Sequence, residues 1–149
     1  MFSTAAFAAR LDLVNIGAAG TFVSPRPVTA TAIARALPFE TAVAIRPASE
    51  VIRLVDGGPP RVPAGALVFV SVLMKIPTKR PALPLELPAG GDWMLRAIER
   101  RGAFVICARR IDRQRGVDLS AVLARAFGVP FTTRSWNTME RIAAAIRAL

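Results

Sequence analysis

Three observations predict an α+β protein with at least partly antiparallel sheet. Helical and strand-like patterns alternate along the chain, and two pairs of short strand patterns are each separated by a tight turn, as in β-hairpins. The chain of 149 residues is 53% apolar, which is too apolar for a disordered protein and sufficient for one domain or two small subdomains.

The first 60 residues predict a hairpin followed by alternating helix and strand. Thr29 is placed to cap a helix that Pro38 ends. The expected elements are a helix over 2–10, hairpin strands over 11–16 and 21–24, a helix over 30–37, a buried strand over 41–45 and a helix from 47 or 49 to 55. Gly57-Gly58-Pro59-Pro60 then predicts a boundary between a subdomain of residues 1–60 and one of residues 61–149.

The remaining residues predict a second hairpin and two capped helices. Gly102 can supply the positive φ of the hairpin turn. Asp118 can cap one helix, which Gly128 is placed to end, and Asn137 can cap the last. The expected elements are a strand over 66–74, a connecting loop over 75–92, hairpin strands over 93–98 and 103–108, a helix over 119–127 and a final helix over 137–149. A helix through residues 94–99 stays open as an alternative, because short apolar segments are ambiguous by pattern.

The charge of the chain is basic and uneven. Residues 1–74 carry six basic and four acidic side chains, a net +2, whereas residues 75–149 carry fourteen and six, a net +8. The total is a weak signal, because abundant Arg, Ala and Pro together are typical of a GC-rich genome. An excess concentrated in one half is nevertheless what an anion-binding face requires.

Several kinds of chemistry lack the residues they need. The chain has no His and no Tyr, and the single Cys107 excludes an internal disulfide and a cysteine-based zinc site within one chain. We therefore predict no metal and no cofactor. The longest uncharged apolar run, residues 62–74, has 13 residues, whereas a membrane-spanning helix needs about 20. Because the N-terminus also lacks a convincing secretory signal, we expect a cytoplasmic protein with no membrane segment.

A stretch near the C-terminus carries a resemblance to a known family. Residues 123–138 are Leu-Ala-Arg-Ala-Phe-Gly-Val-Pro-Phe-Thr-Thr-Arg-Ser-Trp-Asn-Thr. This resembles the signature Leu-Gly-Val-x-Ala-Thr-Thr-Arg-Asn-Trp-Asn-Thr of the domain-of-unknown-function 1697 family, with Phe131 and Ser135 as departures. The resemblance implies two small ferredoxin-like α/β subdomains in tandem with mostly antiparallel sheets. Since the family's first strand has no counterpart here, it also implies a truncated first subdomain, and it implies no particular reaction.

The same stretch contains the best candidate for a ligand site, because hydroxyls and a guanidinium gather where a helix is expected to begin. The residues are Thr132, Thr133, Arg134, Ser135, Trp136 and Asn137. Unpaired N–H groups at a helix N-terminus favour an anion, so a phosphate or carboxylate could be held there. The structural alternative is that Ser135 or Asn137 caps the helix, while Trp136 packs into the core and Arg134 pairs with an acid.

A band of seven arginines is the second candidate, as a surface for nucleic acid or another polyanion. The band consists of Arg96, Arg100, Arg101, Arg109, Arg110, Arg113 and Arg115. Ferredoxin-like sheets can bind RNA through exposed aromatic rings, and the aromatic residues in or beside this band are Trp93 and Phe104. The alternative is an ordinary solvated face.

Three functions stay open. We favour a non-catalytic binding module for nucleic acid or another polyanion, which uses the basic second half. The second is an enzyme or small-ligand protein that acts on a phosphorylated or carboxylated molecule near Arg134 and Trp136. The third is a homodimer formed through a sheet edge that the missing first strand leaves open.

Overall fold

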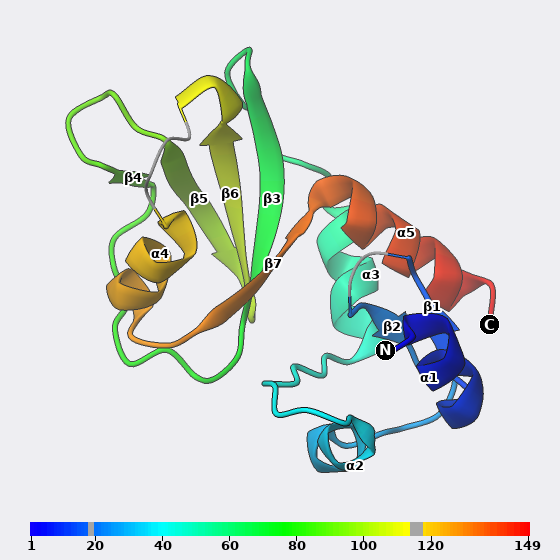
Figure 1. Ribbon diagram of the computed structural model, residues 1–149. Coiled ribbons are helices and arrows are strands. Elements are labelled where there is room, and N and C mark those ends of the chain that lie inside the picture. The colour runs from blue at the N-terminus through cyan, green and yellow to red at the C-terminus, as the bar shows by residue number, and fades with distance from the viewer. Residues whose placement is uncertain (18–19, 114–117) are drawn as a thin grey trace. The chain divides into compact units, whose positions relative to one another are not determined.

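The computed structural model describes residues 1–17, 20–113 and 118–149, and its contacts divide the chain into two compact units (Figure 1). Unit 1 comprises Met1–Asp56 and Asn137–Leu149, and unit 2 comprises Gly57–Trp136. Each unit contains helices and an antiparallel sheet, so the predicted α+β class is confirmed. We expected subdomains of residues 1–60 and 61–149, whereas the contacts group residues 137–149 with unit 1.

Unit 1 is built from helices and a short hairpin. Its elements are α1 (Thr4–Leu11), β1 (Val14–Asn15), β2 (Phe22–Val23), α2 (Ala30–Ala36), α3 (Ala48–Asp56) and α5 (Trp136–Arg147), whose first residue belongs to unit 2. Two of the helix starts are fixed by neighbouring polar residues. The Ser3 side chain accepts a hydrogen bond from the N–H of Ala6, and the Thr29 side chain accepts one from Ala32, as the sequence predicts for Thr29.

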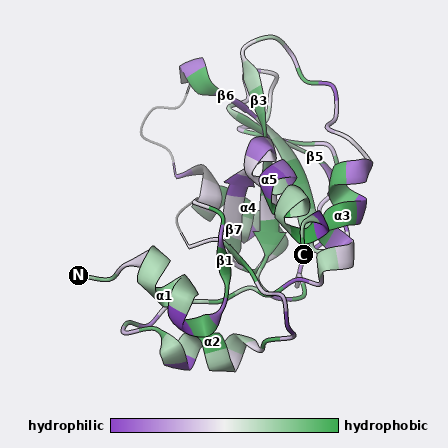
Figure 2. Ribbon diagram, turned by 90° about the vertical axis from the view of Figure 1, so that its right-hand side faces the viewer, coloured by the Kyte–Doolittle hydropathy of each residue, from purple (hydrophilic) through white to green (hydrophobic). Residues whose placement is uncertain are grey.

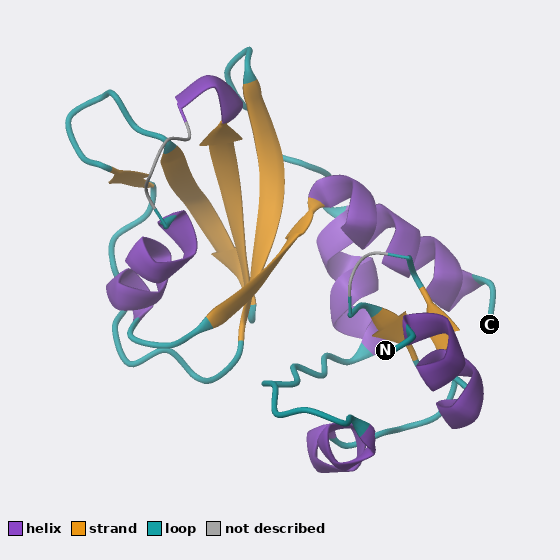
Figure 3. Cartoon of the chain, viewed as in Figure 1, coloured by secondary structure: helices purple, strands orange, loops and turns teal. Residues whose placement is uncertain are grey.

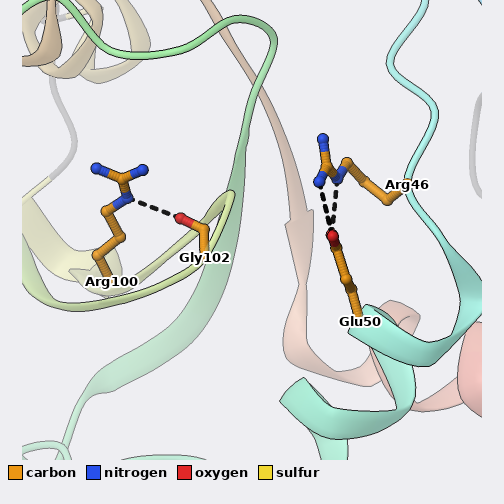
Figure 4. A network of polar contacts seen from close by, with 4 residues as sticks. All are labelled: Arg46, Glu50, Arg100 and Gly102. Carbon is orange, nitrogen blue, oxygen red and sulfur yellow. Dashed lines mark hydrogen bonds and ion pairs between the residues drawn. The ribbon is translucent and has the colours of Figure 1, made fainter.

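Ion pairs and apolar packing join these elements within unit 1. Arg46 pairs at 2.7 Å with Glu50 in the first turn of α3 (Figure 4). Asp56, at the end of α3, pairs with Arg147 in α5. The buried apolar residues of the unit include Phe7, Val23, Val51, Leu54, Met139 and Ala143.

The prediction of a strand over residues 41–45 is wrong, because residues 40–47 have no regular secondary structure. An apolar run forms a strand only where another strand pairs with its backbone, and in the described part of unit 1 nothing pairs with this run. Ile45 is accordingly exposed rather than buried. The sequence pattern records hydrophobicity but contains no information about a pairing partner.

Unit 2 is organised around a five-stranded sheet (Figure 3). Its elements are β3 (Ala66–Leu73), β4 (Leu85–Leu87), β5 (Leu95–Arg101), β6 (Phe104–Arg110), a short 3-10 turn (Ile111–Arg113), α4 (Leu119–Phe127) and β7 (Phe131–Ser135). The strand order is β4-β5-β6-β3-β7, and each described pairing is antiparallel. The inner strand β3 consists of hydrophobic residues apart from Ser71 (Figure 2).

The hairpin of β5 and β6 confirms one of the two open interpretations of residues 94–108. Gly102 lies in its turn with φ of 61°, the left-handed conformation that glycine adopts without strain. The alternative helix over residues 94–99 is therefore wrong. Strand β7 was not expected, because its Thr-Thr-Arg-Ser segment lacks the apolar alternation that marks a strand in a sequence.

The strand order is consistent with the ferredoxin-like detail, which stays a prediction. Strands β6 and β7 both run antiparallel to β3, which lies between them, and α4 connects the two. This is the split β-α-β arrangement of ferredoxin-like folds. Between β3 and β5, the connection contains the short strand β4 and otherwise irregular backbone.

Helix α4 packs against one face of this sheet and closes its core. The Asp118 side chain accepts from the N–H of Ala121 at 3.1 Å, and Gly128 ends the helix with φ of 75°, as the sequence predicts. The spacing of Val117 and Val122 also predicts a hydrophobic staple at the start of this helix, and Val117 lies outside the described residues. The buried core consists of Leu73, Leu95, Ala97, Val105, Cys107, Leu123, Phe127 and Val129.

We expect Leu123→Ala to lower the free energy of unfolding by about 2–5 kcal/mol, because it leaves a cavity in a closed core. Leu123 is 1% exposed and faces the sheet. Urea denaturation measures this change. Arg125→Ala, at an exposed position of the same helix, is the matched control and should change stability by no more than about 0.5 kcal/mol. Equal effects of the two substitutions would contradict the packing of α4 on the sheet.

Candidate anion-binding surface

The residues predicted as an anion site are divided between the two faces of the sheet. Thr132 to Ser135 lie in β7, where successive side chains point to opposite faces. In the register with β3, Ser71 is opposite Thr133 and Val70 is opposite Arg134. Thr133 and Arg134 therefore lie on opposite faces, and the structure does not bring them together at one site.

Several of these side chains bond within their own unit. The Ser71 and Thr133 hydroxyls are 2.9 Å apart and share a hydrogen bond. The Nη1 atom of Arg134 donates to the Thr132 hydroxyl at 2.9 Å and to the Thr133 carbonyl at 2.8 Å. This half-buried guanidinium therefore bonds within its own edge strand. These partners are a hydroxyl and a carbonyl, whereas the structural alternative expects an acid.

The start of α5 differs from the expected capping pattern. The helix begins at Trp136, which is buried, so that Asn137 lies in the first turn and not at the cap position. Ser135 is the residue that immediately precedes the helix. Trp136 thus packs inside the protein, as the structural alternative predicts, while Asn137 is exposed.

The arginines of the predicted band are largely engaged inside unit 2. Five of the seven have described side chains, which are those of Arg96, Arg100, Arg101, Arg109 and Arg110. The side chain of Arg113 and the whole of Arg115 lie outside the described residues. Of the five, Arg100 is exposed and the other four are half-buried.

Two of the arginines lie over the ring of Trp93. The guanidinium carbon of Arg96 is 4.3 Å from the centre of the indole ring and that of Arg110 is 4.0 Å away. Trp93 is 1% exposed, and Arg96 also lies 3.6 Å from a carboxylate oxygen of Glu86. A cation over a buried indole gains about 0.5–2 kcal/mol, so these charges contribute to the stability of the sheet.

The other arginines of the band also have partners nearby. Arg101 pairs with Glu99 at 2.9 Å and donates to the Gly58 carbonyl at 3.2 Å. Arg109 lies with its guanidinium carbon 5.2 Å from the centre of the Phe69 ring. The Nε of Arg100 donates to the carbonyl of Gly102 at 2.7 Å (Figure 4). The described arginines of the band thus mainly make contacts within unit 2 that stabilise its sheet.

A different group of cations is exposed beside the C-terminal end of α4. We call it the α4-end cluster, and it consists of Lys75, Lys79, Arg80 and Arg125. The Nζ of Lys79 donates to the Arg125 carbonyl at 3.3 Å. Among the described residues, no ion pair involves any of these four side chains. The cluster therefore offers charge to an external anion.

The cluster is held together by backbone contacts between segments that are far apart in the sequence. The N–H groups of Thr78 and Lys79 both donate to the Phe127 carbonyl, at 3.1 and 3.0 Å. The Thr78 hydroxyl donates to the Gly128 carbonyl at 3.3 Å. The sequence does not predict this cluster, although Lys75 and Lys79 are the only lysines of the chain and both fall in the predicted connecting loop over residues 75–92.

Cys107 lies in the core and has the properties of an inert thiol. Burial raises the pKa of Cys107 to about 12, against smaller opposing effects of a hydrogen bond with Ser71 and the charge of Arg109. The cavity beside it, which Thr133 and Ser120 also line, measures about 10 Å³. That volume accommodates no more than one water molecule.

The described residues provide no grouping of three His, Cys, Asp or Glu side chains that could hold a metal ion. Within those same residues, the helices are too short or too polar to cross a membrane.

No family model, curated protein or solved structure matches the sequence. The resemblance of residues 123–138 to the domain-of-unknown-function 1697 family therefore stays a prediction.

The buried thiol predicts a pH dependence of stability. In the unfolded chain a thiol ionises near pH 8.5, whereas folded Cys107 keeps its proton up to about pH 12. Between these values the unfolded chain has lost a proton that the folded chain retains, so the stabilising contribution falls as pH rises. From pH 9 to 11, the free energy of unfolding should fall by up to about 1.4 kcal/mol per pH unit more in the wild type than in Cys107→Ala.

Urea denaturation of the two proteins across this pH range measures the difference. Lysines and other groups titrate in both proteins and cancel in the comparison. Parallel pH profiles of the wild type and Cys107→Ala would contradict the burial of an ionisable thiol at this position.

Proposed function

We propose that unit 2 is a non-catalytic module that binds nucleic acid through contacts with the phosphate backbone. The observation that carries the proposal is the α4-end cluster, four exposed cations with no described acidic partner. Lysine and arginine side chains that neutralise phosphates release condensed counterions, which is the main source of sequence-independent affinity.

The division of charge between the two units supports this location. Unit 2 contains thirteen basic and five acidic residues, a net +8, whereas unit 1 contains seven and five, a net +2. The excess thus coincides with the unit that carries the α4-end cluster. A cytoplasmic location belongs to the same proposal, and the free thiol of Cys107 fits a reducing compartment.

The face of the sheet does not support base stacking as the mode of binding. RNA-binding ferredoxin-like sheets stack bases on exposed aromatic rings. Trp93 and Phe104, the aromatic residues of the band, are 1% and 2% exposed. Val70 and Ile106, at the centre of the sheet, are fully buried. Binding through the cation cluster is therefore the better supported mode.

The small-ligand alternative has less support from the geometry. The cavity near Thr133 measures about 10 Å³ and is too small for a phosphorylated metabolite. The larger groove of unit 1, about 720 Å³, is lined by Ala34 and residues 37–42. Glu40 is the charged residue of that lining, and its carboxylate would repel an anion.

The dimer alternative places the contact at a sheet edge that the missing first strand leaves open in the first subdomain. The described sheet of unit 1 is the pair β1-β2, whose strands have two residues each, so it offers few backbone groups to a second chain. Light scattering at several protein concentrations distinguishes this alternative from a monomeric binding module.

We expect wild-type protein to bind labelled duplex DNA with an affinity that falls roughly 100-fold between about 50 and 200 mM salt, if all four cations contact phosphates. Fluorescence anisotropy measures this slope. In Lys75→Gln/Arg80→Gln the slope should decrease by about two phosphate contacts, since both side chains are exposed and lack described partners.

The matched control is Arg35→Gln/Arg61→Gln, which removes the same charge from exposed positions outside the cluster. It should retain nearly the wild-type slope. Absence of binding at the lower salt concentration rejects a nucleic-acid function. Equal weakening in the two double variants would show a general effect of net charge and reject the cluster as the binding surface.

A further inference from the structure

One apolar side chain projects from the α4-end cluster. Ile76 is 83% exposed, and among the large apolar residues of the described chain only Met1 is more exposed. Lys75 precedes it, and Lys79 and Arg80 follow it. A single exposed apolar residue is common in proteins and means little by itself. Its place among cations that have no described acidic partners is the informative feature.

The segment that presents Ile76 is anchored on both sides. The N–H of Met74 donates to the Pro130 carbonyl at 3.1 Å, and the N–H of Thr78 donates to the Phe127 carbonyl at 3.1 Å. Between these anchors lie only Lys75, Ile76 and Pro77, of which Pro77 is buried. The isoleucine is thus held out on a short, fixed turn, so that little conformational freedom is lost when it inserts into a partner.

Duplex DNA has phosphates that cations can contact and stacked base steps that an apolar side chain can enter, and this turn carries both kinds of residue. Proteins that bind the minor groove of DNA hold phosphates with basic residues and insert an apolar side chain, often Ile, Leu, Met or Pro, between base steps. The inserted side chain partly unstacks the bases and kinks the duplex. Lys75, Lys79 and Arg80 belong to the same short segment as Ile76, so three charges are near the apolar side chain in the sequence.

We propose that Ile76 is a wedge that enters the minor groove of duplex DNA and bends it, while Lys75, Lys79 and Arg80 hold the adjacent phosphates. This inference rests on the proposed nucleic-acid function and adds its substrate, a DNA duplex. A single strand is a poorer match, because single-stranded sites stack bases on aromatic rings and this turn has none.

An anionic membrane is also a poorer match for the turn. Even a myristoyl chain gives only marginal attachment to a bilayer, and the side chain of one isoleucine buries much less apolar surface. The flanking cations would attract anionic lipids, but nothing else in the turn would hold the protein at the bilayer.

The test is energy transfer between dyes at the two ends of a short duplex saturated with full-length protein. Wild type should shorten the distance between the ends. Ile76→Ala should bind about tenfold more weakly, keep the wild-type salt slope and leave the duplex straight. Ile76→Met should restore most of the bend, because methionine also acts as a wedge. The urea midpoint of each variant checks that it folds.

Ile111→Ala is the matched control, because Ile111 is also exposed, at 51%. Ile111 follows Arg110, which is opposite Ala66 at the start of β3, whereas Ile76 follows the end of that strand. About 20 Å of strand separates these two ends. Ile111→Ala should bind and bend DNA as the wild type does.

The outcomes separate this inference from the proposed function. If wild type fails to bind DNA at low salt, both are rejected. If it binds with a steep salt slope and leaves the duplex straight, the proposed function stands and the wedge is rejected. Bending by Ile76→Ala as strong as wild type also rejects the wedge. Ile76-dependent sedimentation with anionic vesicles, without DNA bending, would assign the turn to a membrane surface instead.

Discussion

Phe127 is the residue on which both the core of unit 2 and its exposed cation cluster depend. Its ring is 2% exposed and packs edge-on against Phe131, with ring centres 5.4 Å apart. Its carbonyl, which the end of α4 leaves without a helical partner, accepts the N–H groups of Thr78 and Lys79. Gly128 permits this close approach, because it has a φ of 75° and any Cβ would collide with the Thr78 side chain. The turn that carries the cations is thus fixed by the same residue that closes the core.

The basic residues of unit 2 serve two different physical purposes. Arginine has a planar guanidinium that stacks on aromatic rings and donates hydrogen bonds. Arg96 and Arg110 both lie over the Trp93 ring, and Arg110 also donates to the Trp93 carbonyl at 3.5 Å. Lysine carries a compact, strongly hydrated charge, and both lysines of the chain lie on the exposed turn beside α4. The net charge of unit 2 counts all of these residues alike. The burial of each side chain and its contacts show which of them are available to an external anion.

The features that the sequence predicts correctly depend on interactions between residues that are close together in the chain. Asp118 and Gly128 cap α4 through atoms within four residues, and Gly102 turns a hairpin through its own backbone, so local patterns were sufficient. The pairing of β7 with β3 and the contact of Thr78 with Phe127 join residues about 50 or more positions apart. No local pattern contains these pairings, and the faces of β7 and the exposure of the α4-end cluster depend on them. The site predicted over Thr132–Asn137 therefore combined neighbouring residues of the sequence. In the structure, the side chains of those in β7 point alternately to the two faces of the sheet.

Three cations of the α4-end cluster lie in the segment that follows β3, and this position has a consequence for specificity. Contacts between cations and phosphates fix the position of a protein on DNA and carry no direct sequence information. A wedge, in contrast, is sensitive to how readily a base step unstacks, and the TA and CA/TG steps are the most easily kinked. Sequence preference in such a module would arise from the deformability of the duplex at Ile76, without a hydrogen bond to any base edge. In the proposed complex, the sheet and α4 would serve as the support that holds the wedge and the cations in place.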